Sequence, residues 1–253
     1  MKVFLSDLVF WDRSYEDTME FLRENSVENL EFFIEPLDSE SLAKVQKILD
    51  NYRFKEISFH GPFRKCNLAV MDEKEWENTV YSYEESFKIG GKYNPRYYVL
   101  HTNEGVDKTI PHLKEKISEK IEKLHKLAEK YGATLAVENV GLKEKNVFDQ
   151  KDYEELILKN NYRALIDVGH AFVNGWDIEG LIERLGENII GYHFHNNDGK
   201  EDWHRPIGEG DIDYKKICSA VKKYSPEAAI VLEYYFIHPA DTAIKDMKRI
   251  EKL

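Results

Sequence analysis

The sequence has few cysteines and no long apolar run. Its two cysteines, Cys66 and Cys218, are far apart and form no CxxC pair. Such isolated cysteines indicate reduced thiols, so we expect a cytoplasmic protein and not a disulfide scaffold. No apolar run approaches the roughly 20 residues of a membrane span. The opening MKVFLSDLVFWDRS is interrupted by Asp7 and lacks a small-residue cleavage site, so it predicts a first strand and not a signal peptide.

Positive charge is also scarce. The chain has 36 Lys and Arg against 47 Asp and Glu, which gives a formal net charge of −11. This balance disfavours non-specific binding of nucleic acid through a general basic surface. It leaves room for a local positive groove, and bound divalent cations would offset part of the charge. Nucleic acid is therefore a less favoured partner than a small molecule.

No low-complexity segment or Pro/Gly/Ser-rich linker divides the chain, and β-type and helix-type patterns alternate throughout. Eight strands are expected to begin at Lys2, Asn29, Lys55, Arg96, Thr134, Arg163, Ile189 and Ala228. Such alternation implies a parallel sheet, and the length is close to the roughly 250 residues of one barrel. We therefore predict a single (β/α)8 TIM barrel domain over residues 1–253. A doubly wound sheet is the alternative, but its usual glycine-rich loop is missing from DLVFWDRS.

The clearest helix is expected from His112 to Lys130, with Pro111 where a first helical residue would be. Its apolar residues recur every three or four positions, as in an amphipathic helix. They are Leu113, Ile117, Ile121, Leu124 and Ala128. Three aspartates are expected as the N-caps of other helices, namely Asp152, Asp213 and Asp241.

Six of the predicted strands end on a residue that can bind a metal. These residues are His60, His101, Glu138, Asp167, His195 and Glu233. Because the carboxyl ends of parallel strands share one face of a barrel, we expect the six side chains to converge there. No basic residue stands at a strand end to neutralise the three carboxylates, and burying them without a cation is costly. The sequence therefore predicts a metal site, and mixed imidazole and carboxylate ligands suit Zn²⁺, Mn²⁺, Co²⁺ or Fe²⁺.

Each of these residues also has a structural interpretation, because a histidine at a strand end is commonly a hydrogen-bonded structural residue. His170, Asp202 and His204 lie in the loops that follow two of the same strands, so they are further candidates for the site. His193 alternates with His195 and is expected to face inward, where it would hydrogen-bond to a ligand residue.

Four segments, SFHGPF, AVENV, IDVGH and HFHNNDG…DWHRPIGEGDID, resemble the xylose isomerase-like TIM barrels. That family includes sugar isomerases and epimerases as well as endonuclease IV. The resemblance implies a shared single-metal site at Glu138, Asp167, His195 and Glu233. It also implies that the additional ligands of the trinuclear zinc endonucleases fall on His60, His101, His170, Asp202 and His204. The implied cofactor is one to three ions of Mn, Zn or Co.

Some motifs depart from endonuclease IV. The chain has Asp-Val-Gly-His at 167–170 where that enzyme would resemble Asp-Thr-Cys-His, and Asp-Gly-Lys at 198–200 where it would carry Asp-Ser-Lys. The loop at 60–63 reads His-Gly-Pro-Phe and not the polar His-Asp-Ser-Tyr. These differences favour a metal-dependent sugar or sugar-phosphate isomerase or epimerase. The alternatives are a trinuclear zinc phosphodiesterase acting at abasic sites in DNA, and a non-catalytic barrel that binds a ligand or metal.

In the sugar enzymes, Glu138 and Glu233 would carry protons to and from the substrate through a cis-enediolate. His170 would hydrogen-bond a substrate hydroxyl or bind a second metal. The sequence does not choose between isomerisation and epimerisation, and it leaves the oligomeric state open. The turn at 207–211, IGEGD, is either a phosphate-binding loop or a plain turn. Five aromatic residues could stack on a sugar or belong to the core: Phe10, Trp11, Phe63, Trp176 and Trp203.

Overall fold

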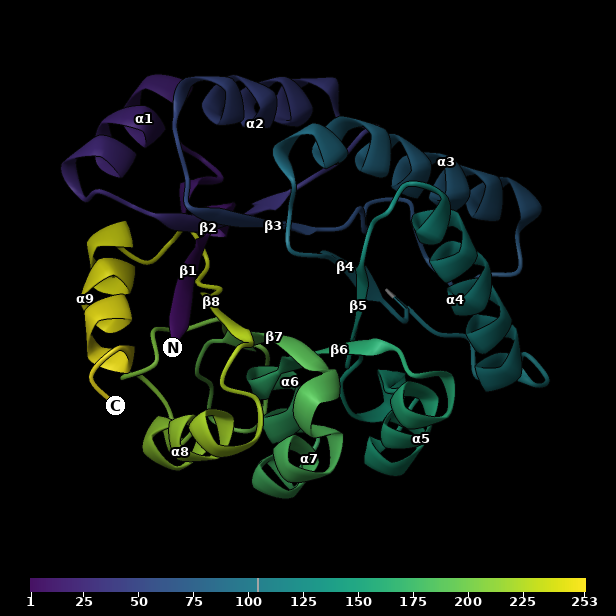
Figure 1. The fold of residues 1–253 in the computed structure, drawn as a ribbon. Helices are drawn as coiled ribbons and strands as arrows, with labels where there is room; N and C mark the ends of the chain where they lie inside the picture. Colours follow the sequence, from purple (N-terminus) through teal and green to yellow (C-terminus); the bar gives the residue numbers. More distant parts are fainter. Residues whose placement is uncertain (104) are drawn as a thin grey trace.

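The computed structural model describes residues 1–103 and 105–253. Its strands close into a parallel barrel in chain order, with β1 paired to β8 (Figure 1). The strands are β1 (Lys2–Ser6), β2 (Asn29–Phe33), β3 (Glu56–His60), β4 (Tyr98–His101), β5 (Leu135–Glu138), β6 (Arg163–Asp167), β7 (Ile189–Phe194) and β8 (Ala229–Leu232). Every strand begins within two residues of its predicted start, and the (β/α)8 fold is confirmed.

Helices surround the ring of strands on its outside (Figure 1). The α-helices are α1 (Tyr15–Glu24), α2 (Ser39–Asn51), α3 (Glu73–Gly90), α4 (Leu113–Lys130), α5 (Gln150–Asn160), α6 (Val168–Val173), α7 (Ile178–Leu185), α8 (Tyr214–Tyr224) and α9 (Ala240–Ile250). Short 3-10 helices lie at Asp7–Phe10, Gly91–Tyr93, Lys143–Lys145 and Gly186–Asn188. Within the described ranges, none of these helices combines the length and the apolar character of a membrane span.

The barrel wall separates two apolar cores. Because neighbouring residues of a strand face opposite sides, Val3 and Leu5 pack outward against the helices while Phe4 faces the interior. The inner cluster also contains Tyr97, Val99, Ala136, Leu165, Ala229 and Val231. In the outer core, the predicted apolar face of α4 is fully buried. The inner cluster fills the ring, so it forms a packed floor and not a channel.

Some helix boundaries differ from the sequence-based expectations. The N-cap of α8 is Asp213, as expected, but that of α5 is Asp149, whose carboxylate accepts a hydrogen bond from the backbone N–H of Asp152. The N-cap of α9 is Pro239, so Asp241 lies in the first turn. Both misplaced aspartates still favour the helix, because negative charge in the first turn interacts well with the helix dipole.

The start of α4 also differs from the prediction. His112 precedes the helix in a left-handed conformation with φ 56°, and helical geometry begins at Leu113. Pro111 is therefore two residues before the helix and not its first residue. A proline disfavours helical geometry in the residue before it and not in the one after, so its position alone could not fix the boundary.

Candidate metal centre

The predicted strand-end residues gather at one mouth of the barrel. Strands β3, β4, β5 and β6 end on His60, His101, Glu138 and Asp167. His195 and Glu233 follow β7 and β8 by one residue. The mouth contains a cavity of about 500 Å³, into which His170, Asp202 and His204 also point. The structure thus brings all nine predicted residues to one face of the barrel.

The first group of potential ligands is formed by His60, His101 and Glu138, whose nitrogen and oxygen atoms lie within 4.8 Å of one another. His101 Nε2 is 3.0 Å from Glu138 Oε2. His60 Nδ1 is 2.9 Å from the backbone oxygen of Gly61, so this nitrogen carries the proton and Nε2 keeps its lone pair. The ring of Phe33 stacks on His60 at 4.1 Å and fixes the plane of the imidazole.

The second group is formed by Asp167, His195 and Glu233, all of them buried. His195 Nε2 lies 3.1 Å from both carboxylate oxygens of Asp167. Asn139 holds the backbone of Asp167, since its Oδ1 accepts from Asp167 N at 2.7 Å and its Nδ2 donates to Asp167 O at 2.9 Å. Asp167 also caps α6 by accepting from the N–H of His170. These contacts leave the carboxylate little freedom to turn.

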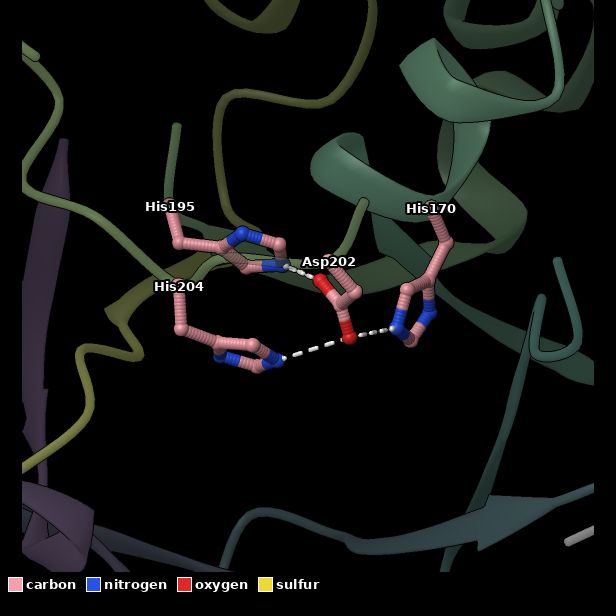
Figure 2. Close-up of side chains that lie close together, drawn as sticks. All are labelled: His170, His195, Asp202 and His204. Atoms are coloured by element: carbon pink, nitrogen blue, oxygen red, sulfur yellow. Dashed lines mark hydrogen bonds and ion pairs between the residues drawn. The ribbon is translucent and has the colours of Figure 1, made fainter. Parts of the chain in front are cut away.

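The third group surrounds Asp202 (Figure 2). Asp202 Oδ2 is 3.1 Å from Nε2 of both His170 and His204, and Oδ1 is 3.5 Å from His195 Nε2. His204 has φ 42°, a left-handed conformation that costs a non-glycine residue free energy. Its ring stacks between His195, at 3.9 Å, and Tyr235, at 4.5 Å. His195 therefore belongs to both the second and the third group.

The geometry of the imidazoles fits a metal. The Nδ1 atoms of His60, His170 and His204 lie 2.9 to 3.1 Å from the backbone oxygens of Gly61, Asn139 and Glu233. Each Nε2 is thereby directed at carboxylates or at the mouth. A histidine whose other nitrogen is held by a carbonyl is the usual arrangement of a metal ligand. Neutral imidazoles with carboxylates form a donor set for Zn²⁺, Mn²⁺ or Co²⁺.

Opposite charges shift the pKa values in these groups. Burial alone would lower the pKa of His170, but Asp167 and Asp202 raise it to about 10. Burial likewise opposes protonation of His204, whose pKa Asp202 raises to about 9. Burial raises the pKa of Glu233, whereas His101 and His193 hold the pKa of Glu138 well below its usual range despite burial. The carboxylates thus favour the protonated forms of His170 and His204, and a divalent cation that binds these imidazoles would displace their protons.

Sequence reasoning missed Glu31 of β2. This buried carboxylate lies inside the barrel, 2.8 Å from His193 Nε2, and accepts a hydrogen bond from Ser58 Oγ at 2.7 Å. The other nitrogen of His193 is 3.4 Å from Glu233 Oε2 and 3.6 Å from Glu138 Oε1. His193 faces inward as expected, and it joins Glu31 to the carboxylates of the mouth. The available signal was one acidic residue in the otherwise apolar strand NLEFF.

Most of the candidate stacking aromatics lie away from the mouth cavity, which Phe63 lines. Phe10 is buried in the outer core against Phe21, and Trp176 packs on Tyr153. Trp11 meets the edge of Phe33, and Trp203 is 44% exposed beneath the guanidinium of Arg205. Of the two alternatives left open for Phe10, the structure therefore supports the core.

The IGEGD turn is shaped by packing. A side chain at Gly210 would overlap the amide of Asn196, which accepts a hydrogen bond from Ile212 N and donates one to Ile207 O. The glycine at this position is thus explained by close approach within the turn. Phosphate binding by this loop stays a prediction.

Known structures share this architecture over nearly all of the chain. A D-tagatose 3-epimerase-like protein matches with a TM-score of 0.82 and 23% identity, over 100% of this chain and 97% of that one. The D-psicose 3-epimerase of Clostridium cellulolyticum H10, solved with D-tagatose, matches with a TM-score of 0.72 and 18% identity, over 91% and 84%. The IOLI protein, solved with a bound zinc atom, matches with a TM-score of 0.78 and 19% identity, over 99% and 96%.

Residues 17–253 match the model described as xylose isomerase-like TIM barrel. The match covers the segments that carry every strand-end residue of the mouth, from His60 to Glu233. The chain belongs to the xylose isomerase-like TIM barrel family.

Proposed function

We propose that the protein is a divalent-metal-dependent isomerase or epimerase of a sugar or sugar phosphate. The observation that carries the proposal is the placement of Glu138 and Glu233. These carboxylates come from β5 and β8, line the same cavity, and approach the same nitrogen of His193. Two carboxyl groups at one substrate site can remove a proton from one face of a carbon and return one to the other face. The sugar epimerases among the structures of similar fold support the same reaction class.

One ion would be held by Glu138, Asp167, His195 and Glu233, which belong to overlapping groups of potential ligands. When bound, such an ion polarises the carbonyl of an open-chain sugar and makes the neighbouring C–H more acidic. The mouth cavity of about 500 Å³ is within the range of small-molecule sites, which are about 300–1,000 Å³. A monosaccharide with or without a phosphate group is the substrate class that we propose.

In this mechanism the Glu138 carboxylate removes the proton from the carbon beside the carbonyl, which leaves an enediolate. The carboxyl group of Glu233 then returns a proton to carbon. Return to the opposite face of the same carbon gives the epimer. Return to the neighbouring carbon, together with transfer of the hydroxyl proton between the two oxygens of the enediolate, interconverts aldose and ketose. His170, whose Nε2 is directed at the mouth, donates a hydrogen bond to a substrate hydroxyl.

Solvent exchange tests this proposal directly. The protein, saturated in turn with Mn²⁺, Co²⁺ and Zn²⁺, is incubated in D₂O with D-tagatose, D-psicose and a set of aldoses, ketoses and their phosphates. We expect deuterium at a carbon next to the carbonyl, detected by NMR, together with the epimer or isomer. Absence of exchange in every sugar, with occupied metal confirmed by elemental analysis, would contradict the proposal.

A second function is favoured by one specific observation. The nine candidate ligands form adjoining groups around His101, Asp167 and Asp202, as a site for three ions would require. The alternative is therefore a trinuclear zinc phosphodiesterase that hydrolyses DNA at abasic sites. Three zinc ions per chain and cleavage of an abasic duplex, with an intact duplex as the control, would establish this function and replace the sugar proposal.

A further inference from the structure

One carboxylate lies inside the barrel, beneath the mouth cavity. It belongs to Glu31 of β2, which is fully buried and is not among the described residues that line the cavity. Ser58, the register partner of Glu31 on β3, donates a hydrogen bond to Oε2 at 2.7 Å. The other oxygen, Oε1, lies 2.8 Å from Nε2 of His193 on β7. Glu31 thus connects β2 with β7, two strands that are not neighbours in the ring (Figure 1).

The contact with Glu31 fixes the imidazole of His193. An ionised carboxylate accepts hydrogen bonds and does not donate them, so Nε2 of His193 carries a proton and donates to Glu31. The ring is fully buried, and the ring of His60 lies nearly parallel to it, with 5.8 Å between the centroids. One nitrogen and one face of the imidazole are therefore held, and the orientation of the ring determines where Nδ1 lies.

Nδ1 of His193 lies between the two carboxyl groups to which the proposed mechanism assigns the proton transfers. It is 3.4 Å from Glu233 Oε2 and 3.6 Å from Glu138 Oε1. Among the residues that the structure describes, this nitrogen has no hydrogen-bond partner, so it contacts both glutamates without being bound to either. Any displacement of the ring therefore changes its distance to both glutamates at once.

Proton transfer at carbon depends strongly on the placement of the carboxyl oxygens, because a displacement of about 1 Å can lower a rate by about 10²-fold. We propose that Glu31 is a positioning residue, which acts through the imidazole of His193 to hold the carboxyl groups of Glu138 and Glu233 in place for the two proton transfers. This inference rests on the isomerase or epimerase function proposed above. Glu31 itself does not line the cavity, so its effect is on the rate of the proton transfer and not on the binding of the sugar.

Kinetics of deuterium incorporation separate positioning from binding. At saturating metal, Glu31→Ala should lower kcat about tenfold or more and leave KM within about threefold of the wild type. Glu31→Gln should retain most of the rate, because its amide oxygen can still accept from Nε2 of His193. Glu40→Gln, an exposed change in α2, is the control and should not differ from the wild type. Equal losses of kcat in Glu31→Gln and Glu31→Ala, or a rise of KM with kcat unchanged, overturn the positioning role.

NMR of the metal-free protein tests the contact itself. The chain has nine histidines, so labelling them with ¹⁵N gives a small set of imidazole signals. We expect a slowly exchanging N–H signal from Nε2 of His193, identified by its absence in His193→Gln. The signal should persist in Glu31→Gln and disappear or shift in Glu31→Ala. Circular dichroism confirms that each variant is folded, and Glu31→Met, which fills the same space without a carboxylate, replaces Glu31→Ala if that variant does not fold.

The two measurements distinguish failure of this inference from failure of the proposed function. The NMR experiment contains neither sugar nor metal. An unchanged His193 signal in Glu31→Ala, or no protected Nε2–H in the wild type, overturns the role of Glu31 alone. A metal-loaded wild type that exchanges no proton of any sugar overturns the proposed function, and the effect of Glu31 on the rate fails with it.

Discussion

Gly169 of α6 lies directly against the imidazole of His195. A side-chain methyl group built on Gly169 would overlap three atoms of the His195 ring. His195 is fully buried and lies beside Asp167. Its ring therefore cannot move away from position 169 without losing its contact with the Asp167 carboxylate. Position 169 of the Asp-Val-Gly-His segment is therefore a glycine because a larger side chain would clash with His195, which follows β7.

We expect Gly169→Ala to displace His195 and to lower the affinity for Mn²⁺ or Co²⁺ at least tenfold. Overpacking of this kind costs about 1–3 kcal/mol of unfolding free energy. Calorimetric metal titration and urea denaturation measure the two effects. Gly91→Ala is the matched control, because Gly91 has φ −56° and open space around it, so stability and metal affinity should be unchanged or slightly higher. Equal metal affinity in both variants would disprove the role of His195.

Glu138→Gln and Glu233→Gln should each reduce exchange of substrate protons with solvent by about 10²-fold or more, the usual contribution of a general acid or base. Glutamine keeps the size of the side chain but cannot carry the proton. The rate is measured by NMR in D₂O at saturating metal. Glu187→Gln, an exposed change near the start of β7, is the control and should exchange as the wild type does. Full activity of either mouth variant would remove the proton-carrier assignment.

Removal of metal should lower the thermal stability of the protein. The carboxylates around His193 repel one another. An ion that binds the folded chain but not the unfolded chain stabilises the protein by about 2.7 kcal/mol when its free concentration is about 100 times its dissociation constant. Differential scanning calorimetry before and after chelation, followed by readdition of Mn²⁺, gives the shift. Elemental analysis is expected to find one tightly held ion per chain. A melting temperature that does not respond to chelation of a loaded sample would contradict the metal centre.

Asp7 should make the unfolding free energy fall as pH rises. Burial raises its pKa from 3.8 to about 7, with Glu31 and Glu233 adding to this and Lys44 opposing it. Between these values the folded chain holds a proton that the unfolded chain has lost, so stability decreases from about pH 4 to about pH 7. Asp7→Asn should remove this decrease. The unfolding free energy of the variant should exceed that of the wild type by a margin that grows by up to about 3 kcal/mol from pH 5 to pH 8.

Urea denaturation of the two proteins at pH 5, 6, 7 and 8 measures the effect. The relevant quantity is the difference in unfolding free energy between Asp7→Asn and the wild type at each pH. Parallel stability curves would show that Asp7 keeps an ordinary pKa in the folded chain. A difference that grows toward low pH would contradict the sign of the shift.

The barrel and the convergence at its mouth were predictable because both depend on local patterns. Each strand is a short apolar run, and six of these runs stop on a histidine or a carboxylate at the carboxyl end of the strand. Parallel strands place those ends together whatever the lengths of the helices between them. The sequence therefore located His60 and Glu233 at the same mouth although 172 residues separate them in the chain.

Features that depend on tertiary packing were not predictable. Glu31 becomes buried only when β2 enters the closed ring, and nothing local distinguishes it from a surface acid. The N-cap of α5 was uncertain for a different reason. Asp149 and Asp152 stand three residues apart, and either can begin a helix, so the connection from β5 decides which one does. The need for glycine at position 169 was not predictable either, because it results from contact with His195, which follows another strand.

The order of the strands has a consequence for biosynthesis. Glu233 lies directly after β8, and the ring closes only when β8 pairs with β1. Just before β8 is made, the growing polypeptide carries eight of the nine candidate ligands but lacks Glu233 and the closing strand. The set of Glu138, Asp167, His195 and Glu233 can therefore form only after β8 has been synthesised and has paired with β1.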